Sequence, residues 1–431
     1  MEMSTSGAQF LTRFLPSCRK TWVPVPSGRA RSEDWTGDDV RAGRAAGRPQ
    51  AVRTTAVRGP AGPLRCVTDL SIEEIGPDGR RDALSSALET FRPRVPDWTP
   101  FHEPSHLDLW MRHLSEPGSG RTVVAWDGSG SLVGYAPFMR VRDRLGPMTV
   151  PTLRFIGNNI GYPGDILRGQ VFAAPPDGPA VEAILAHVAS RWPLGRWDLG
   201  YMPASSPTRR ATSEILGDGL VDSRSLPGVP FASVDLPEDW DAYLASLTGN
   251  TRSTYRRCLR HLERRGGVKV VIDGAPEKAR DRVAQLIRNH ERWHAGTAKE
   301  TWFGNHAAKA FFVASSELLA REGRYVAAAL EVDGTPIAWI VGPVYDGTYY
   351  EHIGSFDRAY SEWSPGVILG MELMRELISR GFRRVDLGPG SSLFKTRLGA
   401  VERPHVRVQG HRGWLRRAAR LRARLRGPWA R

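Results

Sequence analysis

Cysteine is scarce in this chain of 431 residues, and its three cysteines, Cys18, Cys66 and Cys258, lie far apart in the sequence. An odd number of widely spaced thiols does not fit a disulfide framework or a thiolate metal site. The histidines do not recur at ligand spacing with acidic partners, so we expect no metal centre. This cysteine usage is typical of a reducing compartment.

Long apolar runs are also missing. No segment reaches the roughly 18 consecutive apolar residues that a membrane-spanning helix needs. The N-terminus has no continuous apolar segment after its first basic residues, as a secretory leader would require. The sequence therefore favours a cytoplasmic protein.

Negative charge is scarce at both ends of the chain. The formal net charge is +14; residues 1–66 carry 11 Lys/Arg against 5 Asp/Glu, and residues 402–431 carry 10 against 1. The middle is therefore close to neutral, which argues against a DNA partner. Residues 1–66 mix Arg, Gly, Pro and Ser without periodicity, so we expect a disordered basic tail.

The clearest structural pattern runs from Arg324 to Gly399. Two Asp-Gly pairs divide its first part into three apolar runs, which predicts an antiparallel meander over 324–332, 335–345 and 348–353. A proline and glycine after Ser364 then mark the start of an amphipathic helix that ends before Gly381. A strand follows at 384–387, so the strand-helix-strand unit should be parallel and right-handed.

An earlier stretch repeats this order. A hairpin, a third strand and a helix lead to Arg196-Trp197-Asp198-Leu199-Gly200, which matches Arg384-Val385-Asp386-Leu387-Gly388. The duplication predicts an α/β fold of two related domains, each a mixed, mostly antiparallel sheet flanked by helices. The expected division is a tail at 1–66, a first domain at 67–205, a linker at 206–230, a second domain at 231–410 and a basic amphipathic tail at 411–431.

Four motifs of the second half suggest a family. They are, in order, Gly354-Ser355-Phe356-Asp357-Arg358-Ala359-Tyr360, Ser364-Pro365-Gly366, Asp386-Leu387-Gly388 and Phe394-Lys395. Together they resemble the CelD-like (BcsL-type) acetyltransferases of the GNAT superfamily, which are related to Fem-type peptidyl ligases. The resemblance implies two GNAT-like domains side by side, with the acyl donor on the second and the acceptor cleft shaped by the first.

The resemblance also implies an activity. It points to an N- or O-acyltransferase that moves an acyl group, acetyl from acetyl-CoA or another acyl-CoA group, to an amine or hydroxyl of a small molecule. The acceptor would be a sugar, an envelope precursor or a natural product. An acyl carrier protein or, in a Fem-like ligase, an aminoacyl-tRNA stays open as the donor. A non-catalytic module that binds nucleic acid or lipid is the alternative from another class.

Acyl transfer needs a base for the acceptor and a donor of hydrogen bonds to the oxyanion. Side chains alternate along 348–354, so Tyr350 and His352 share one face while Tyr349 and Glu351 share the other. We expect His352 to be a base, because its pKa suits proton transfer near neutrality. A hydrogen-bonded strand histidine without a role is the structural alternative.

Three further residues are catalytic candidates. The resemblance suggests Asp357 as a base or acceptor ligand, and its alternative is a turn aspartate that binds its own backbone. Tyr360 would protonate the leaving thiolate or simply pack. Lys395 would stabilise the oxyanion or hold a phosphate, since it follows a glycine-rich loop at a strand end.

The acyl donor is expected at the helix that starts after Ser364, because a helix N-terminus favours an anion. The predicted donor-binding residues are Arg358, Ser364, Gly366, Gly388 and Gly390. Familiar acetyl-CoA enzymes have a Gln/Arg-x-x-Gly-x-Gly/Ala run at this helix start. Residues 360–366 instead contain one glycine and a proline, which leaves the identity of the donor open.

The acceptor is expected near an arginine-rich helix and an aromatic cluster. The predicted acceptor-binding residues are Arg252, Arg256, Trp293, Tyr350 and Asp386. A solvated helix face and ordinary core packing are the structural alternatives.

The C-terminal segment 411–426 carries Trp414, Ala418, Leu421 and Leu425 at helical spacing, with seven arginines on the other faces. Such a helix either packs on the preceding domain or lies on an anionic membrane surface. The second alternative would place the protein peripherally at the cytoplasmic face of a membrane.

Overall fold

The computed structural model describes residues 69–76, 81–145, 147–158, 169–192, 194–220, 228–294 and 302–418. The tail expected at 1–66 lies outside the described residues, and so does the C-terminal tail beyond Ala418. Within the described part, no helix has both the length and the apolar character needed to cross a membrane.

The N-terminal half has two helices on each face of its sheet. Its elements are β1 (Ser71–Ile75), α2 (Arg81–Phe91), α3 (Pro104–Leu114), β2 (Gly120–Trp126), β3 (Leu132–Leu145), β4 (Met148–Phe155), β5 (Phe172–Ala173), α4 (Ala180–Arg191), β6 (Arg196–Pro203) and α5 (Pro207–Leu216). Neighbouring residues of β2 face opposite cores: Val123 packs with α4 and α5, and Val124 packs with α2 and α3.

The C-terminal half has the same two-sided arrangement. Its elements are β7 (Val229–Asp235), α6 (Trp240–Ser246), α7 (Gly249–Glu263), β8 (Val268–Asp273), α8 (Pro276–His294), α9 (His306–Arg321), β9 (Tyr325–Val332), β10 (Thr335–Tyr345), β11 (Thr348–Tyr350), β12 (Ile353–Phe356), the 3-10 helix η6 (Arg358–Trp363), α10 (Pro365–Ser379), β13 (Arg384–Pro389), α11 (Leu393–Arg397) and β14 (Val401–His411). One face packs against α6, α7 and α10, and the other packs against α8 and α9.

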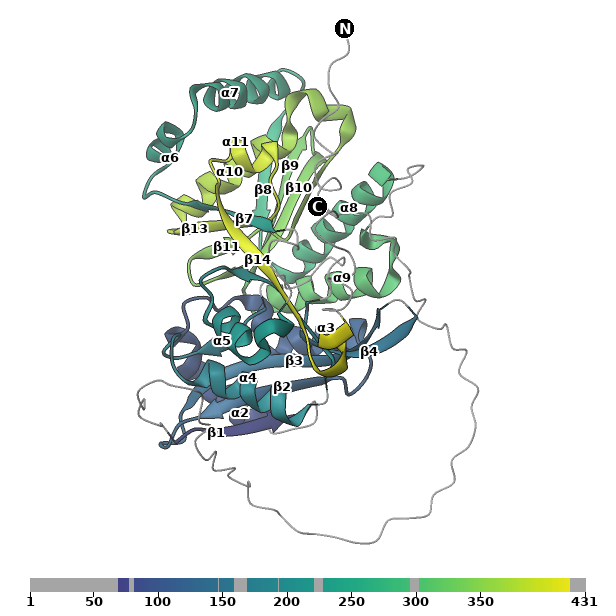
Figure 1. Ribbon diagram of the computed structural model, residues 1–431. Helices are drawn as coiled ribbons and strands as arrows, with labels where there is room; N and C mark the ends of the chain where they lie inside the picture. Colours follow the sequence, from purple (N-terminus) through teal and green to yellow (C-terminus); the bar gives the residue numbers. More distant parts are fainter. Residues whose placement is uncertain are drawn as a thin grey trace, which may run out of the picture.

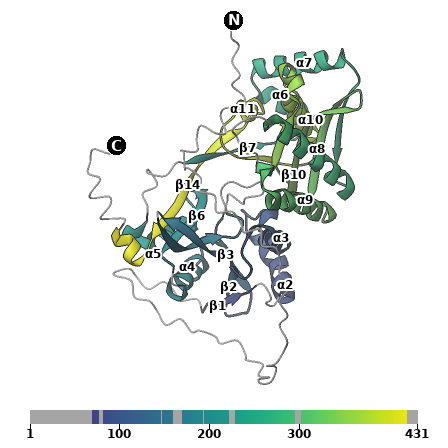
Figure 2. The same ribbon diagram turned by 90° about the vertical axis from the view of Figure 1, so that its right-hand side faces the viewer.

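The two halves share one 14-stranded sheet. Its order is β1-β2-β3-β4-β6-β14-β7-β13-β11-β10-β9-β8, with β12 on β10 and β5 on β3. The long last strand β14 pairs with β6 at one end and with β7 at the other, so it joins the halves (Figures 1 and 2). The prediction of a mixed, mostly antiparallel sheet flanked by helices is confirmed, and the exact domain boundaries stay a prediction.

The predicted duplication appears in the register of the two parallel strand pairs. Thr152 on β4 pairs with Arg196 on β6, and Thr348 on β11 pairs with Arg384 on β13. Four residues after these arginines, Gly200 and Gly388 both have a left-handed backbone, with φ of 75° and 69°. Glycine is the residue that adopts this conformation at least cost, which explains why both repeated motifs end with it.

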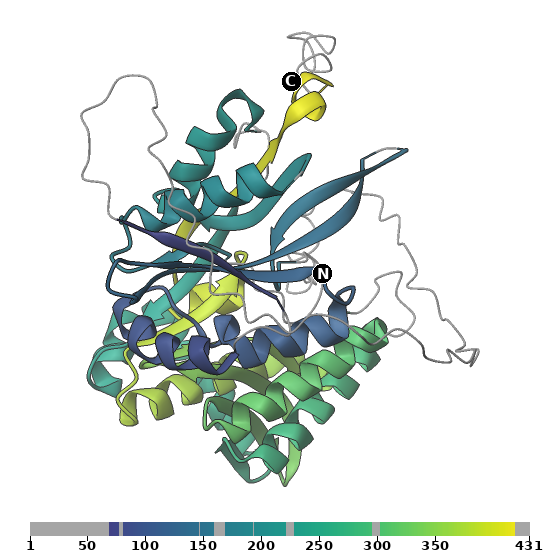
Figure 3. The ribbon, with the colours of Figure 1, turned by 90° about the horizontal axis from the view of Figure 1, so that it is seen from below.

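The halves also meet through a shared core and ion pairs. Phe311 of α9 lies in the core formed by α2 and α3, and Figure 3 shows the blue helices of the N-terminal half against the green ones. Glu103, which is buried, pairs with Arg92 at 2.9 Å and with Arg324 of the other half at 3.2 Å. A buried carboxylate needs such partners, so these contacts hold the halves in one orientation.

One β-bulge interrupts the strand that was expected to run unbroken over 348–353. Val341 pairs with Ile353 and Val344 pairs with Tyr349, so two residues of β10 face three residues of the opposite strand. The extra residue separates β11 from β12. Gly342 lies opposite, and a Cβ atom there would be 1.9 Å from the Tyr350 carbonyl oxygen.

We expect Gly342→Ala to destabilise the fold by at least ~2 kcal/mol, because the added methyl group overlaps main-chain atoms that the bulge cannot move cheaply. Gly128→Ala is the matched control, since nothing lies within 4 Å of a Cβ at that position. The free energies of unfolding of both variants, measured by chemical denaturation, check this. Equal stability of Gly342→Ala and the wild type would contradict the close approach.

Candidate active site

The candidate site lies where β11 and β13 stop pairing. The two strands are parallel from Thr348–Arg384 to Tyr350–Asp386, and the Glu351 amide donates to the Asp386 carbonyl at 2.7 Å. Beyond this bond, β12 continues along β10 and β13 continues along β7. The facing edges of β12 and β13 have no strand partner among the described strands. We call this point of divergence the fork, and Glu351 is the residue that lies at it.

Glu351 carries the most unusual carboxyl group in this region. Burial raises its pKa to about 7; the Lys395 ammonium lowers that pKa and the Asp386 carboxylate raises it. Its Oε2 atom is buried and has no hydrogen-bond partner within the described part of the chain. A carboxyl group that titrates near neutrality and has a free oxygen can accept a proton from a bound nucleophile.

Lys395 closes the loop beside this carboxyl group. Its Nζ donates to three carbonyl oxygens in a row, those of Gly388 at 3.1 Å, Pro389 at 2.6 Å and Gly390 at 2.9 Å. Gly388 and Gly390 have φ of 69° and 86°, the left-handed conformation in which the loop can curl around the ammonium group. Lys395 therefore fixes the loop and supplies a positive charge near Glu351.

Asp386 also has a structural partner. Its Oδ1 accepts from the Gly388 amide at 2.8 Å, and its side chain is buried. It acts on Glu351 through its charge. The predicted acceptor-binding role of Asp386 stays untested.

The start of α10 offers a second, cationic feature. Ser364 has φ of 48° and precedes Pro365, and the Val367 and Ile368 amides both donate to the Ser364 carbonyl. Proline has no N–H, so Gly366 carries the remaining amide of the first turn. The Arg397 guanidinium, from α11, donates to the Ser364 hydroxyl at 3.3 Å. A helix N-terminus with one amide and an arginine fits a phosphate group.

The alternation predicted along this strand is correct. Tyr350 and His352 both contact Phe101 of the N-terminal half; their ring centroids lie 6.0 and 5.4 Å, respectively, from that of Phe101. Tyr349 instead lies in the core beside α10, and the Glu351 charge acts on it. The two faces of the strand thus serve different parts of the molecule.

His352 lies in an aromatic environment away from the fork. Its ring is 4.8 Å from Phe312, and both ring nitrogens are buried without a partner in the described residues. Burial lowers its pKa to about 4. A general base needs a pKa near neutrality and must lie within reach of the acceptor. This environment therefore favours the structural interpretation of His352 over the catalytic one.

The other predicted residues have the following contacts. Asp357 caps η6 by accepting from the Ala359 amide at 3.0 Å, and Tyr360 packs on Trp363 with ring centroids 5.7 Å apart. Arg358 lies over the Trp293 ring at 4.7 Å, and Trp293 contacts Phe356 at 5.3 Å. Arg358, Trp293 and Asp357 therefore gather along β12, beyond the fork.

The arginine-rich helix has one residue with a clear structural role. Arg252 donates to the carbonyls of Leu244, Ala245 and Leu247 at 3.2, 3.2 and 2.6 Å, so it caps the end of α6. Arg256 is exposed on α7. The helix begins at Gly249, and the Thr248 side chain caps it by accepting from the Thr251 amide.

Sequence patterns did not point to two residues of the candidate site, Glu351 and Arg397. Glu351 was placed on its face correctly, but the burial of its Oε2 atom follows from tertiary packing, which periodicity does not reveal. Arg397 follows Lys395 within one helical turn, and its contact with Ser364 depends on how α11 packs on Gly370 of α10. A glutamate within the strand predicted over 348–353, three residues before Gly354, was the available signal.

Comparison with known proteins identifies the class of the second half. Residues 249–396 match the model of the acetyltransferase (GNAT) domain, so this segment of the chain belongs to the GNAT superfamily. The segment contains the fork, Glu351, Lys395 and the start of α10. No curated protein matches the sequence.

Solved structures of similar fold cover most of the chain. The crystal structure of FemX aligns with a TM-score of 0.52 and 11% identity over 78% of this chain and 96% of that chain. A tandem GNAT protein from the clavulanic acid biosynthesis pathway aligns with a TM-score of 0.45 and 12% identity over 80% and 99%. At such identities the FemX match shows a common fold, consistent with the predicted relation to Fem-type ligases.

We expect Lys395→Met to lower the stability of the protein by roughly 2 kcal/mol, because three carbonyl oxygens lose a charged donor. Lys269→Met, at an exposed position on β8, is the control and should change stability by less than ~0.5 kcal/mol. Thermal and chemical denaturation of the two variants compare them. If both variants melt together with the wild type, the carbonyl contacts contribute nothing measurable.

Proposed function

We propose that this protein is an N- or O-acyltransferase that moves an acyl group, acetyl from acetyl-CoA in the simplest case, to an amine or hydroxyl of a small acceptor. The observation that carries the proposal is Glu351, a half-buried residue at the fork of a GNAT-type domain, whose carboxyl oxygen Oε2 is buried and whose pKa is raised to about 7. Near neutral pH, such a group exists in part as a carboxylate in a site of low polarity.

In the proposed reaction, the Glu351 carboxylate accepts the proton of the acceptor N–H or O–H as that atom bonds to the acyl carbon. The carbon–sulfur bond of the thioester then breaks, and the thiolate takes up a proton. Tyr360 stays a candidate for that last transfer. The free edges of β12 and β13 offer main-chain groups to the extended part of the donor, and Gly366 and Arg397 hold a phosphate group.

The acceptor belongs, by this proposal, to the sugars, envelope precursors or natural products. In this proposal Trp293 and Phe356, which pack together along β12, line the acceptor side of Glu351, and Arg358, expected from the sequence to bind the donor, lies over the Trp293 ring. An aminoacyl-tRNA donor is the alternative, supported by the fold shared with FemX. We place the reaction in the cytoplasm, where acyl-CoA and charged tRNA are both available.

We expect Glu351→Gln to lower kcat/KM by about 10²-fold or more and to remove its rise with pH. General base catalysis contributes on that order. In the wild type, kcat/KM should rise through about pH 7 as Glu351 loses its proton. The exposed Glu362→Gln is the matched control and should keep the wild-type profile. A Glu351→Gln enzyme with unchanged rate and profile would remove Glu351 from the mechanism.

Stability separates a catalytic loss from misfolding. The folded pKa of Glu351 is raised above its ordinary value, so the folded state holds a proton that the unfolded state releases. The contribution of Glu351 to stability is therefore present at low pH and lost as pH rises toward 7. Above that pH, Glu351→Gln should melt at the same temperature as the wild type or higher.

We expect acetyl-CoA to raise the melting temperature, since a ligand that binds only the folded state stabilises it by mass action. Arg397→Met should reduce that shift, because its guanidinium is proposed to hold a donor phosphate at α10. Arg375→Met, on the exposed side of the same helix, is the control. The absence of a shift with any CoA thioester would direct the search to aminoacyl-tRNA or a carrier protein.

A further inference from the structure

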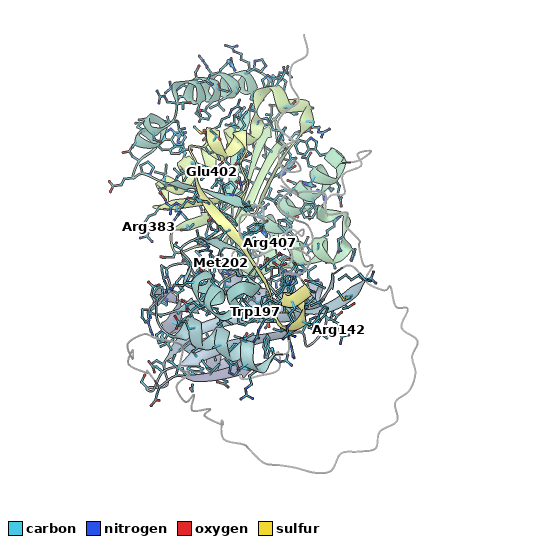
Figure 4. All side chains as sticks on the ribbon, viewed as in Figure 1. Arg142, Trp197, Met202, Arg383, Glu402 and Arg407 are labelled. Atoms are coloured by element: carbon cyan, nitrogen blue, oxygen red, sulfur yellow. The ribbon has the colours of Figure 1, made fainter. Side chains whose placement is uncertain are left out.

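The N-terminal half ends in a surface that combines exposed apolar side chains with arginines. We define the basic end as two neighbouring segments, the tip of the β3–β4 hairpin and the first helical turn after β14. Its residues are Arg142, Arg144, Met148, Trp414, Arg416 and Arg417. Figure 3 shows the hairpin extending beyond the rest of the sheet, and Figure 4 shows Arg142 beside the C-terminal turn.

The two segments are held together by packing. Leu415 is buried, and its side chain lies against Gly195 and next to Val150 of β4, two residues from Met148. The Arg412 amide donates to the Gly195 carbonyl at 2.8 Å, and the Arg412 guanidinium reaches the Ala189 carbonyl of α4. The C-terminal turn is therefore docked on the sheet, with Trp414 on its outer side.

The apolar side chains of this surface are exposed. Trp414 is 57% exposed and Met148 is 42% exposed, and they are two of the four large apolar residues that stand out in the described part of the chain. An exposed tryptophan costs free energy in water, and its ring prefers the interface between water and lipid headgroups.

The charge around these two side chains is positive. In residues 140–154, Asp143 is the one acidic residue, and it is paired with Arg154 at 2.8 Å and Arg196 at 3.3 Å. Arg142, Arg144 and Arg417 are exposed. Beyond the docked turn, residues 419–431 add five arginines and no acidic residue to the sequence. This composition suits a surface that carries negative charge.

From this arrangement we propose that the basic end binds the surface of an anionic lipid bilayer, with the hairpin tip and the C-terminal turn as two contact points. Trp414 and Met148 enter the headgroup region, and the arginines contact lipid phosphates. Binding is chiefly electrostatic because the apolar contact is small, so salt weakens it. In the sequence, membrane contact by the tail alone is one of two alternatives, the other being packing on the preceding domain; the hairpin adds a folded part to the membrane alternative.

The test is co-sedimentation of the full chain with vesicles of phosphatidylcholine, with or without about one-third phosphatidylglycerol. We expect binding to the anionic vesicles at low salt, and its loss without phosphatidylglycerol or at about 0.5 M salt. The double variant Arg142→Glu, Arg144→Glu, with the tail intact, should bind at least about tenfold more weakly, since each arginine contributes about fivefold. Adding Trp414→Ser to this double variant should weaken vesicle binding further.

The matched control changes the same charge in the other half. Arg375→Glu with Arg383→Glu alters exposed arginines of the C-terminal half, where Figure 4 places Arg383, and it should bind vesicles like the wild type. Melting curves confirm that each variant is folded. Wild-type binding by the hairpin variant overturns the proposal, and so does an equal loss in the control variant.

A nucleic acid is the other anionic polymer that arginines attract, and the same variants distinguish it. The wild type could fail to bind anionic vesicles and bind tRNA instead, with that binding abolished by Arg142→Glu and Arg144→Glu. In that case the basic end is an RNA-binding surface and the lipid proposal is wrong. Binding to vesicles that tRNA does not reduce supports the lipid surface.

Discussion

The one-residue bulge opposite Gly342 is the constraint on which the candidate site depends. It divides one strand into β11 and β12, so that β11 still pairs with β13 while β12 leaves that partner. The fork places Glu351 between two unpaired strand edges and sends its neighbours Tyr350 and His352 toward the other half. A regular strand would continue the pairing and leave no main-chain groups for a ligand.

Ionising the Glu351 carboxyl group at the fork costs free energy, and the neighbouring groups limit that cost. Full ionisation of an isolated buried carboxylate would cost several kcal/mol, which is why its pKa rises. Lys395 lowers the pKa again, and three carbonyl oxygens hold that ammonium group in place. The glycine-rich loop thus contributes through its carbonyls, which orient a cation, rather than through amides that would bind an anion.

Sequence patterns predicted the order of elements well because the meander, the helix after Ser364 and the repeated Asp-Leu-Gly motif depend on local chemistry. They say less where tertiary packing decides. His352 has the right residue type for a base, and its ring packs against Phe101 and Phe312, which come from other elements. Arg252 was expected near the acceptor, and its guanidinium caps the end of α6. The functional roles of both residues stay predictions. Glu351 depends on a bulge that no periodicity encodes.

The two halves share a fold, yet among the described residues Glu351 has no ionisable counterpart on β4. The register that aligns Thr152 with Thr348 places Phe155 where Glu351 lies, and Phe155 stacks on Phe138 at 4.9 Å in the core. A Cβ on Gly200 would be 2.0 Å from the Asn158 side chain, whereas the nearest atom to one on Gly388 is 4.0 Å away.

The repeated aspartate also has different charged partners in the two halves. Asp198 pairs with Arg407 of β14 at 2.8 Å, so the last strand neutralises the first fork, while its equivalent Asp386 acts on Glu351. Figure 4 shows Arg407 and Trp197 along this joint. The first half therefore uses the repeated motif to anchor β14, and the second uses it to shape a carboxyl group. The same motif thus has two different surroundings, and a few side chains at each fork account for the difference.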